Sequence, residues 1–114
     1  GGWQIGPWVK VSSPNFDAYM HFTVGKSIAN NTILVSLNIK RSQNGPTKIK
    51  LQYLDGTTVL GTSSDYDLKQ SFETLNIIYK AGKSISDFSF KLTGYNGNGT
   101  LTLSKVEVKS IQAI

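Results

Sequence analysis

The chain has 114 residues, of which 39% are hydrophobic and 17% charged, so it can form one folded domain with its own core and is not a disordered chain. It has no cysteine, which excludes disulfides and thiolate metal sites, and no apolar run approaches the ~18 residues of a membrane helix. Its net charge of +5 comes mainly from scattered lysines, typical of solvated strand faces. Attraction to an anionic polymer, such as a phosphate-bearing wall polysaccharide or DNA, stays open as the alternative.

The first segment is interrupted by Gly6-Pro7, so we expect a strand from about Trp8, with residues 1–7 as a linker or as the lead-in to a first strand. Because the chain begins Gly1-Gly2 and not with Met, we expect one domain, residues 1–114, cut from a longer polypeptide. Residues 16–24 predict a further strand. Its two faces would carry Ala18, Met20, Phe22 and Val24 on one side and Tyr19, His21 and Thr23 on the other.

Residues 32–54 are organised as two strands and a turn. Both strands alternate with a period of two, and the apolar positions are Ile33, Val35, Leu37 and Ile39, then Ile49, Leu51 and Tyr53. Between them, Asn44-Gly45 and Pro46 favour a chain reversal. We therefore predict a central hairpin with one apolar face, which a second sheet must cover.

The rest of the chain predicts short strands joined by tight turns. Asp55-Gly56 predicts a turn into a strand at 57–61, and residues 62–70 have the composition of a loop. Further strands are expected at 71–80, whose inward face is ambiguous, and at 85–93, followed by a glycine-rich hairpin turn at 94–99. The last strand, 100–111, needs a bulge near Ser104-Lys105 to keep its apolar residues in phase. About eight strands and no amphipathic helix predict an all-β, two-sheet antiparallel sandwich of the jelly-roll type.

The residue types needed for catalysis or metal binding do not form a recognisable pattern. His21 is the one histidine and cannot form a histidine-based metal cluster, and no carboxylate pair is marked as catalytic, so no enzyme activity is predicted. Asp65 and Asp67 could offer oxygen ligands to Ca²⁺, but the full calcium-loop spacing is absent and a solvated loop is favoured. No cofactor is expected.

Aromatic residues are the most informative candidates for function. An exposed ring offers a flat apolar face on which the C–H groups of a sugar can stack, while neighbouring polar groups bind its hydroxyls. The candidate ligand-binding residues are the rings of Trp3, Trp8, Tyr19, Tyr66 and Tyr95 and the polar side chains of Gln52, Asp65, Asp67, Asn96 and Asn98. The alternative for each ring is that it seals a loop against the core, or, for Trp8, lies within the core.

Four segments carry a resemblance to a known family: TILVSLNIKRS, KIKLQYLDGTTVLG, SFETLNIIYKAG and GTLTLSKVEV. Their order is similar to that of jelly-roll carbohydrate-binding modules, which are attached to glycoside hydrolases and to tail, baseplate and fibre proteins of phages. The resemblance covers roughly residues 8–110. The family often has an acidic pair where this chain has Ser104-Lys105, a departure that argues against a structural Ca²⁺ near the last strand.

The resemblance implies a non-catalytic module that attaches a phage tail or baseplate protein to saccharide of the host cell surface. The expected partners are a host glycan and the parent multidomain polypeptide, with no nucleic acid and no membrane, and the expected location is extracellular, in the virion tail. The alternatives are a module appended to a secreted glycoside hydrolase and an Ig-like structural or protein-interaction domain of a virion.

Overall fold

The computed structural model describes residues 2–5, 8–11, 18–23 and 32–111, and it describes side chains from residue 21 onward within these ranges. These residues form ten strands: β1 (Gly2–Ile5), β2 (Trp8–Val11), β3 (Ala18–Thr23), β4 (Thr32–Arg41), β5 (Lys48–Asp55), β6 (Thr58–Thr62), β7 (Tyr66–Asp67), β8 (Glu73–Lys80), β9 (Phe88–Tyr95) and β10 (Thr100–Ile111). The eight expected strands are present, and β1 and β7 are additional. The part of the chain that is described contains no helix able to cross a membrane.

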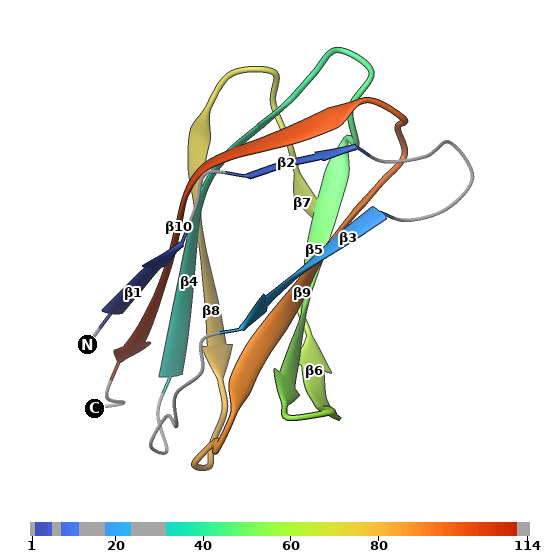
Figure 1. Cartoon of the computed structure of the whole chain (residues 1–114). Coiled ribbons are helices and arrows are strands. Elements are labelled where there is room, and N and C mark those ends of the chain that lie inside the picture. Colours follow the sequence, from blue (N-terminus) through green and yellow to red (C-terminus); the bar gives the residue numbers. More distant parts are fainter. Residues whose placement is uncertain (1, 6–7, 12–17, 24–31, 112–114) are drawn as a thin grey trace.

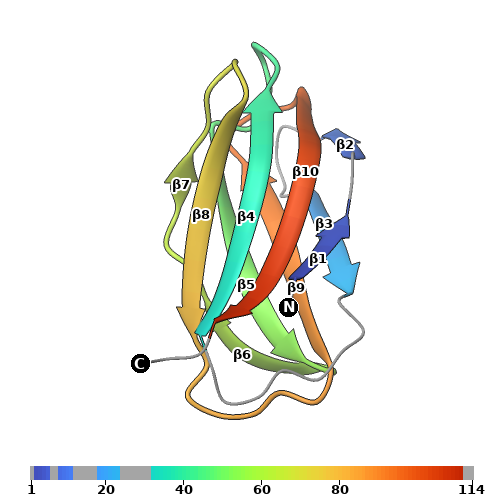
Figure 2. The same cartoon turned by 90° about the vertical axis from the view of Figure 1, so that its left-hand side faces the viewer.

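The strands form two antiparallel sheets that lie face to face (Figure 1 and Figure 2). The β4 sheet has the order β1-β10-β4-β8, with β2 also paired to β10. The β5 sheet has the order β3-β9-β5-β6, with β7 also paired to β5. This arrangement is a β-sandwich consistent with a jelly roll, and it confirms the predicted fold class.

The core lies between the two sheets and follows the period-two pattern of the sequence. Alternate residues of β4 are fully buried, and the residues between them are partly exposed on the outer face. The buried set comprises Ile33, Val35, Leu37 and Ile39 of β4, Ile49, Leu51 and Tyr53 of β5, Phe88, Phe90 and Leu92 of β9, and Leu101, Leu103, Val106 and Val108 of β10. The intervening residues of β4 and β10 therefore form the outer face of their sheet, whereas in β9 the intervening Ser89 is itself buried.

The predicted hairpin between the two central strands is wrong. β4 pairs with β10 and β8, whereas β5 pairs with β9, β6 and β7, so the two strands belong to opposite sheets. The chain does turn at residues 42–47, where the amide of Gly45 donates to the carbonyl of Ser42 at 2.9 Å. This turn crosses the roughly 10 Å between packed sheets. The apolar faces of β4 and β5 both contribute to the core between the sheets, so each is covered by the opposite sheet.

The glycine-rich segment 94–99 also crosses between the sheets and is not the predicted hairpin turn, because β9 and β10 do not pair. It packs against the first crossing: the amides of Asn98 and Gly99 donate to the Asn44 carbonyl at 2.9 and 2.6 Å. The Ser42 amide donates to the Thr100 carbonyl at 3.0 Å. These bonds join the two crossings into one corner of the sandwich. Glycine is needed there because the two backbones approach so closely.

Gly97 gives a test of this corner. A Cβ at Gly97 would lie 2.8 Å from the Pro46 nitrogen and closer still to the Gly45 carbonyl group, whereas a Cβ at Gly61 would meet only the Tyr79 ring at 3.4 Å. We expect Gly97→Ala to lower the free energy of unfolding by about 1–3 kcal/mol, because backbone must move to admit the methyl group. Gly61→Ala is the matched control and should change it less. Equal effects of the two substitutions in denaturant titration would contradict the packing described.

Two local predictions are confirmed and shape the outer faces. The turn at Asp55-Gly56 joins β5 to β6, and Gly56 has φ of 59°. The β10–β4 register shifts between Leu103 and Lys105, which is the predicted bulge. Because of this shift, Val106 and Val108 point into the core, while Lys105, Glu107 and Lys109 lie on the outer side.

Candidate functional site

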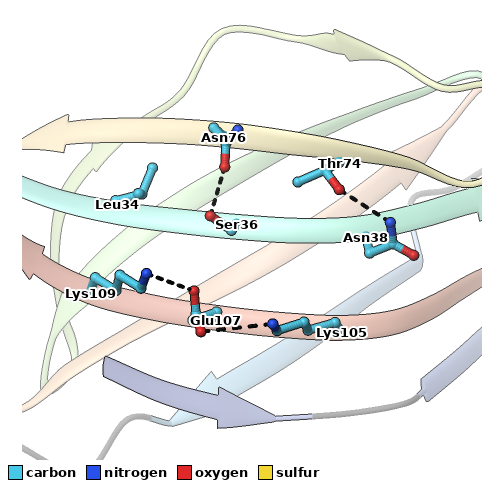
Figure 3. A pocket seen from close by; sticks show the side chains of 8 residues that line it. All are labelled: Leu34, Ser36, Asn38, Thr74, Asn76, Lys105, Glu107 and Lys109. Atoms are coloured by element: carbon cyan, nitrogen blue, oxygen red, sulfur yellow. Dashed lines mark hydrogen bonds and ion pairs between the residues drawn. The ribbon is translucent and has the colours of Figure 1, made fainter. Parts of the chain in front are cut away.

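A groove lies on the outer face of the β4 sheet, across three neighbouring strands (Figure 3). Its volume is about 310 Å³. The lining residues are Leu34, Ser36 and Asn38 of β4, Thr74 and Asn76 of β8, and Lys105, Glu107 and Lys109 of β10. Seven of these eight side chains are polar or charged. The groove therefore offers hydrogen-bond donors and acceptors on a rigid sheet.

The strand register places these residues in rows that cross the groove. β4 is central, with β8 on one side and β10 on the other. The rows are Asn76–Ser36–Glu107, Thr74–Asn38–Lys105 and Ile78–Leu34–Lys109. The bulge of β10 brings Lys105, rather than Ser104, opposite Asn38. An irregularity in the last strand thus completes one of the rows.

A hydrogen-bond ladder fixes the polar side chains of β4 and β8. Ser36 Oγ donates to Asn76 Oδ1 at 2.7 Å, and Asn38 Nδ2 donates to Thr74 Oγ1 at 3.2 Å. The Ser104 hydroxyl donates to Asn38 Oδ1. With its oxygen engaged by Ser36, Asn76 keeps its Nδ2 group as a hydrogen-bond donor on the groove. The ladder therefore holds the amides in place before a ligand binds.

The β10 side of the groove carries charge. Glu107 lies between two lysines: its Oε1 is 3.2 Å from Lys109 Nζ, and its Oε2 is 3.9 Å from Lys105 Nζ. The lysine side chains are half-exposed, whereas that of Glu107 is 24% exposed. One carboxylate thus faces two ammonium groups, and the groove has a surplus of one positive charge.

An exposed aromatic ring lies near one end of the same face. Phe72 is 44% exposed and directly precedes β8, two residues before Thr74 of the groove. The ammonium of Lys40, two residues beyond Asn38 on β4, lies 4.9 Å from the centre of the Phe72 ring. From Phe72 to Ile78 the face extends about 20 Å at the usual rise of a strand. A ligand could therefore combine polar contacts in the groove with stacking on the ring.

Three of the residues expected from the sequence lie on the other sheet, and two of them, Asp67 and Tyr95, are on either side of Lys48. Gln52, Asp67 and Tyr95 lie on the β5 sheet, where Lys48 pairs in register with both Asp67 and Tyr95. The hydrogen bond and charge of Asp67 raise the pKa of Lys48, and Lys50 Nζ lies 5.9 Å from the centre of the Tyr95 ring. This side is a second polar surface with one partly exposed ring.

The other expected residues are dispersed. Tyr66 is half-buried and packs against the core. This position fits the alternative to ligand binding, in which the ring seals a loop against the core. Asp65, Asn96 and Asn98 are exposed, and Asn96 has φ of 65° in the crossing segment. In the backbone register, Trp3 is opposite Val108, Trp8 is opposite Leu103 and Tyr19 is opposite Thr93. The side chains of Trp3, Trp8 and Tyr19 lie outside the described part of the structure.

Metal ligands do not converge in the part of the chain that the structure describes, where no group of three or more histidine, aspartate or glutamate residues could hold an ion. Asp67 is ion-paired with Lys48 instead.

The groove was not predicted from the sequence, because its residues occupy ordinary polar positions of strands. The sequence shows only alternation at these positions: Ser36 and Asn38 separate buried residues of β4, and Asn76 separates Leu75 from Ile77 in β8. Only the register shows that these positions are neighbours across three strands. Phe72 was missed because the inward face of residues 71–80 was ambiguous.

No family model matches the chain, and no curated protein matches it. Solved structures do resemble it. The enzymatically active domain of tailspike protein 4 of bacteriophage CBA120 has a TM-score of 0.69 at 13% identity over 92% of this chain, and this chain spans 15% of that one.

Two carbohydrate-binding modules of Clostridium thermocellum are also similar. The family 35 module gives a TM-score of 0.59 at 8% identity and covers 96% of this chain and 92% of its own. The family 11 module, solved with a β-1,3-1,4-mixed-linked tetrasaccharide, gives 0.60 at 10% identity and covers 100% of this chain and 90% of its own. At these identities the likeness concerns the fold: the chain has the β-sandwich fold of carbohydrate-binding modules.

Proposed function

We propose that the chain is a non-catalytic saccharide-binding module and that the groove on the β4 sheet is its binding site. The observation that carries this proposal is the hydrogen-bond ladder of β4 and β8, whose fixed amide and hydroxyl groups lie near the exposed ring of Phe72. Sugar hydroxyls both donate and accept hydrogen bonds, which amide and hydroxyl side chains match. The apolar face of a sugar ring can stack on Phe72. Glu107, the carboxylate of the groove, is ion-paired to both neighbouring lysines.

We further propose that the module belongs to a phage tail or baseplate protein and attaches it to saccharide of the host surface. The likeness to a domain within a phage tailspike supports this context. The alternative context is a module appended to a glycoside hydrolase, which is supported by the two clostridial modules that this chain matches over about their whole length. In both contexts the module would supply adhesion and its parent polypeptide the remaining activity.

The affinity of one site should be modest. The groove is shallow, and a flexible saccharide loses conformational freedom when it is ordered on a sheet. Several copies on one particle would raise the overall strength of attachment by increasing the effective concentration of sites, without any new contact.

The proposal is tested by Asn76→Ala. Loss of the amide should weaken saccharide binding by about two- to tenfold, the effect of one hydrogen bond, with little change in stability because Asn76 is exposed. Binding is measured by titration calorimetry with a glycan that the wild-type chain selects on an array of cell-surface glycans.

Gln52→Ala is the matched control, a polar truncation on the outer face of the other sheet, and it should leave the affinity unchanged. If Gln52→Ala weakens binding and Asn76→Ala does not, the saccharide binds to the β5 sheet. If the folded wild-type chain binds no glycan on the array or on intact host cells, the proposed function is wrong.

A further inference from the structure

We infer that the groove selects acidic saccharides, in which a carboxylate or phosphate group takes the place of Glu107 as the partner of Lys105 or Lys109. The inference rests on the proposed function and adds the class of ligand. Carboxylate and phosphate share the chemistry that matters here: negatively charged oxygens that accept hydrogen bonds from an ammonium group.

The first support is the charge of the face. On β4, β8 and β10, the outer positions include the ammonium groups of Lys40, Lys105 and Lys109. Among the described residues, Glu107 is the one carboxylate of the groove. Glu73 of β8 is opposite Ile39, a buried residue, and therefore belongs to an inward row. A neutral saccharide would leave this surplus of positive charge without a partner.

The second support is the arrangement of the pair. Lys105 and Lys109 are four residues apart on β10, about 13 Å at the usual rise of a strand, with Glu107 midway between them. One carboxylate engages both lysines, with its two oxygens divided between them at 3.9 and 3.2 Å. An acidic group that arrives at either lysine leaves Glu107 with the other. Binding therefore adds a charge pair without leaving a carboxylate unpaired.

The third support is that the existing pairs are weak enough to exchange. Ion pairs between half-exposed lysines and a carboxylate at the protein surface contribute little to stability. The fixed amides and hydroxyls of β4 and β8 lie alongside, so a sugar chain along the groove would meet charge on one side and neutral hydrogen-bonding groups on the other. An acidic polysaccharide presents both kinds of group.

The test compares phosphomannan, its neutral counterpart mannan, and polygalacturonate as a carboxylate-bearing chain. Wild-type protein should bind at least one of the two acidic polysaccharides about tenfold or more tightly than mannan, and the difference should shrink as salt is raised. Glu107→Gln keeps the size of the side chain and removes its charge. This variant should bind the preferred acidic polysaccharide about three- to tenfold more tightly than wild type, and mannan no more tightly.

Lys105→Gln should lower the affinity for the acidic polysaccharide severalfold. Lys50→Gln, which removes a lysine of the β5 sheet, is the matched control and should change it much less. Double-stranded DNA serves as a second polyanion, and wild type should bind it more weakly than the acidic polysaccharide.

The outcomes separate the two proposals. If wild type and Glu107→Gln bind mannan as well as the acidic chains, the groove takes neutral saccharides: the inference is wrong and the proposed function stands. If DNA binds as tightly as the acidic polysaccharide, the face is a general polyanion surface and the inference is wrong. If neither these polysaccharides nor any arrayed glycan binds, both proposals are wrong.

Discussion

Phe72→Ala should weaken saccharide binding by about tenfold or more, the largest effect of a single substitution on the β4 sheet. A stacked sugar would cover apolar surface of the ring, and that burial together with the ring contact is worth roughly 1.5–3 kcal/mol. Phe72 is 44% exposed and lies outside the core cluster, so its truncation should change the melting temperature little. Titration calorimetry with the selected glycan and thermal unfolding of the same samples measure both effects.

Two further variants separate stacking from general apolar contact. Phe72→Trp keeps an aromatic face and should retain binding, whereas Phe72→Leu keeps apolar bulk without a ring and should resemble the alanine variant. Val59→Ala truncates an apolar residue of the other sheet that is 52% exposed, and it should bind as wild type does. Full binding by Phe72→Ala would show that the ring is not part of the site, while a weakened Tyr95→Ala would place the stacking ring on the β5 sheet.

Most of the fold follows from local pattern, because alternation fixes which face of each strand is buried. The buried set of β4 and the bulge at Ser104-Lys105 were both predicted from phase alone. Pairing was not predictable in the same way. Alternation shows which face of a strand is apolar. It does not show whether the next apolar strand pairs with it in the same sheet or packs on it across the core. The sequence of residues 42–47 is compatible with either a hairpin turn or a crossing between the sheets. In the structure the crossing at 42–47 packs against the distant segment 94–99, a contact that the local pattern does not contain.

The candidate site was less predictable than the fold for a related reason. Residue type alone favours tryptophan, tyrosine and the polar residues near them as candidates for ligand binding. The groove is made of common residues such as Ser36 and Asn76, whose importance comes from being neighbours in three strands. No local signal marks Ser36 as different from any other solvated strand position. Both the strand order β10-β4-β8 and its register, including the bulge of β10, are needed to bring the groove residues together.

Tyr53→Ala should lower the free energy of unfolding by about 3–5 kcal/mol, the largest effect on stability that we expect in the chain. Tyr53 of β5 is 1% exposed, and its ring stacks on Tyr79 of β8 with centroids 4.2 Å apart and planes at 14°. The stack joins the two sheets across the core, so truncation leaves a cavity between them. Denaturant titration should show the loss, and a change under 1 kcal/mol would contradict the packing described.

Tyr53→Phe separates the ring from its hydroxyl. The buried Tyr53 hydroxyl has no hydrogen-bond partner among the described residues, so its removal should change stability by less than about 1 kcal/mol. Burial, with smaller contributions from Tyr66 and Tyr79, raises the pKa of Tyr53 above its ordinary value of 10. Because the unfolded chain loses the phenol proton at a lower pH than the folded chain, this group does not change the free energy of unfolding below about pH 10. Above that pH it lowers the free energy of unfolding as the pH rises. Wild type should therefore lose more stability than Tyr53→Phe between pH 8 and pH 11, and parallel losses in the two proteins would show that the phenol is not buried.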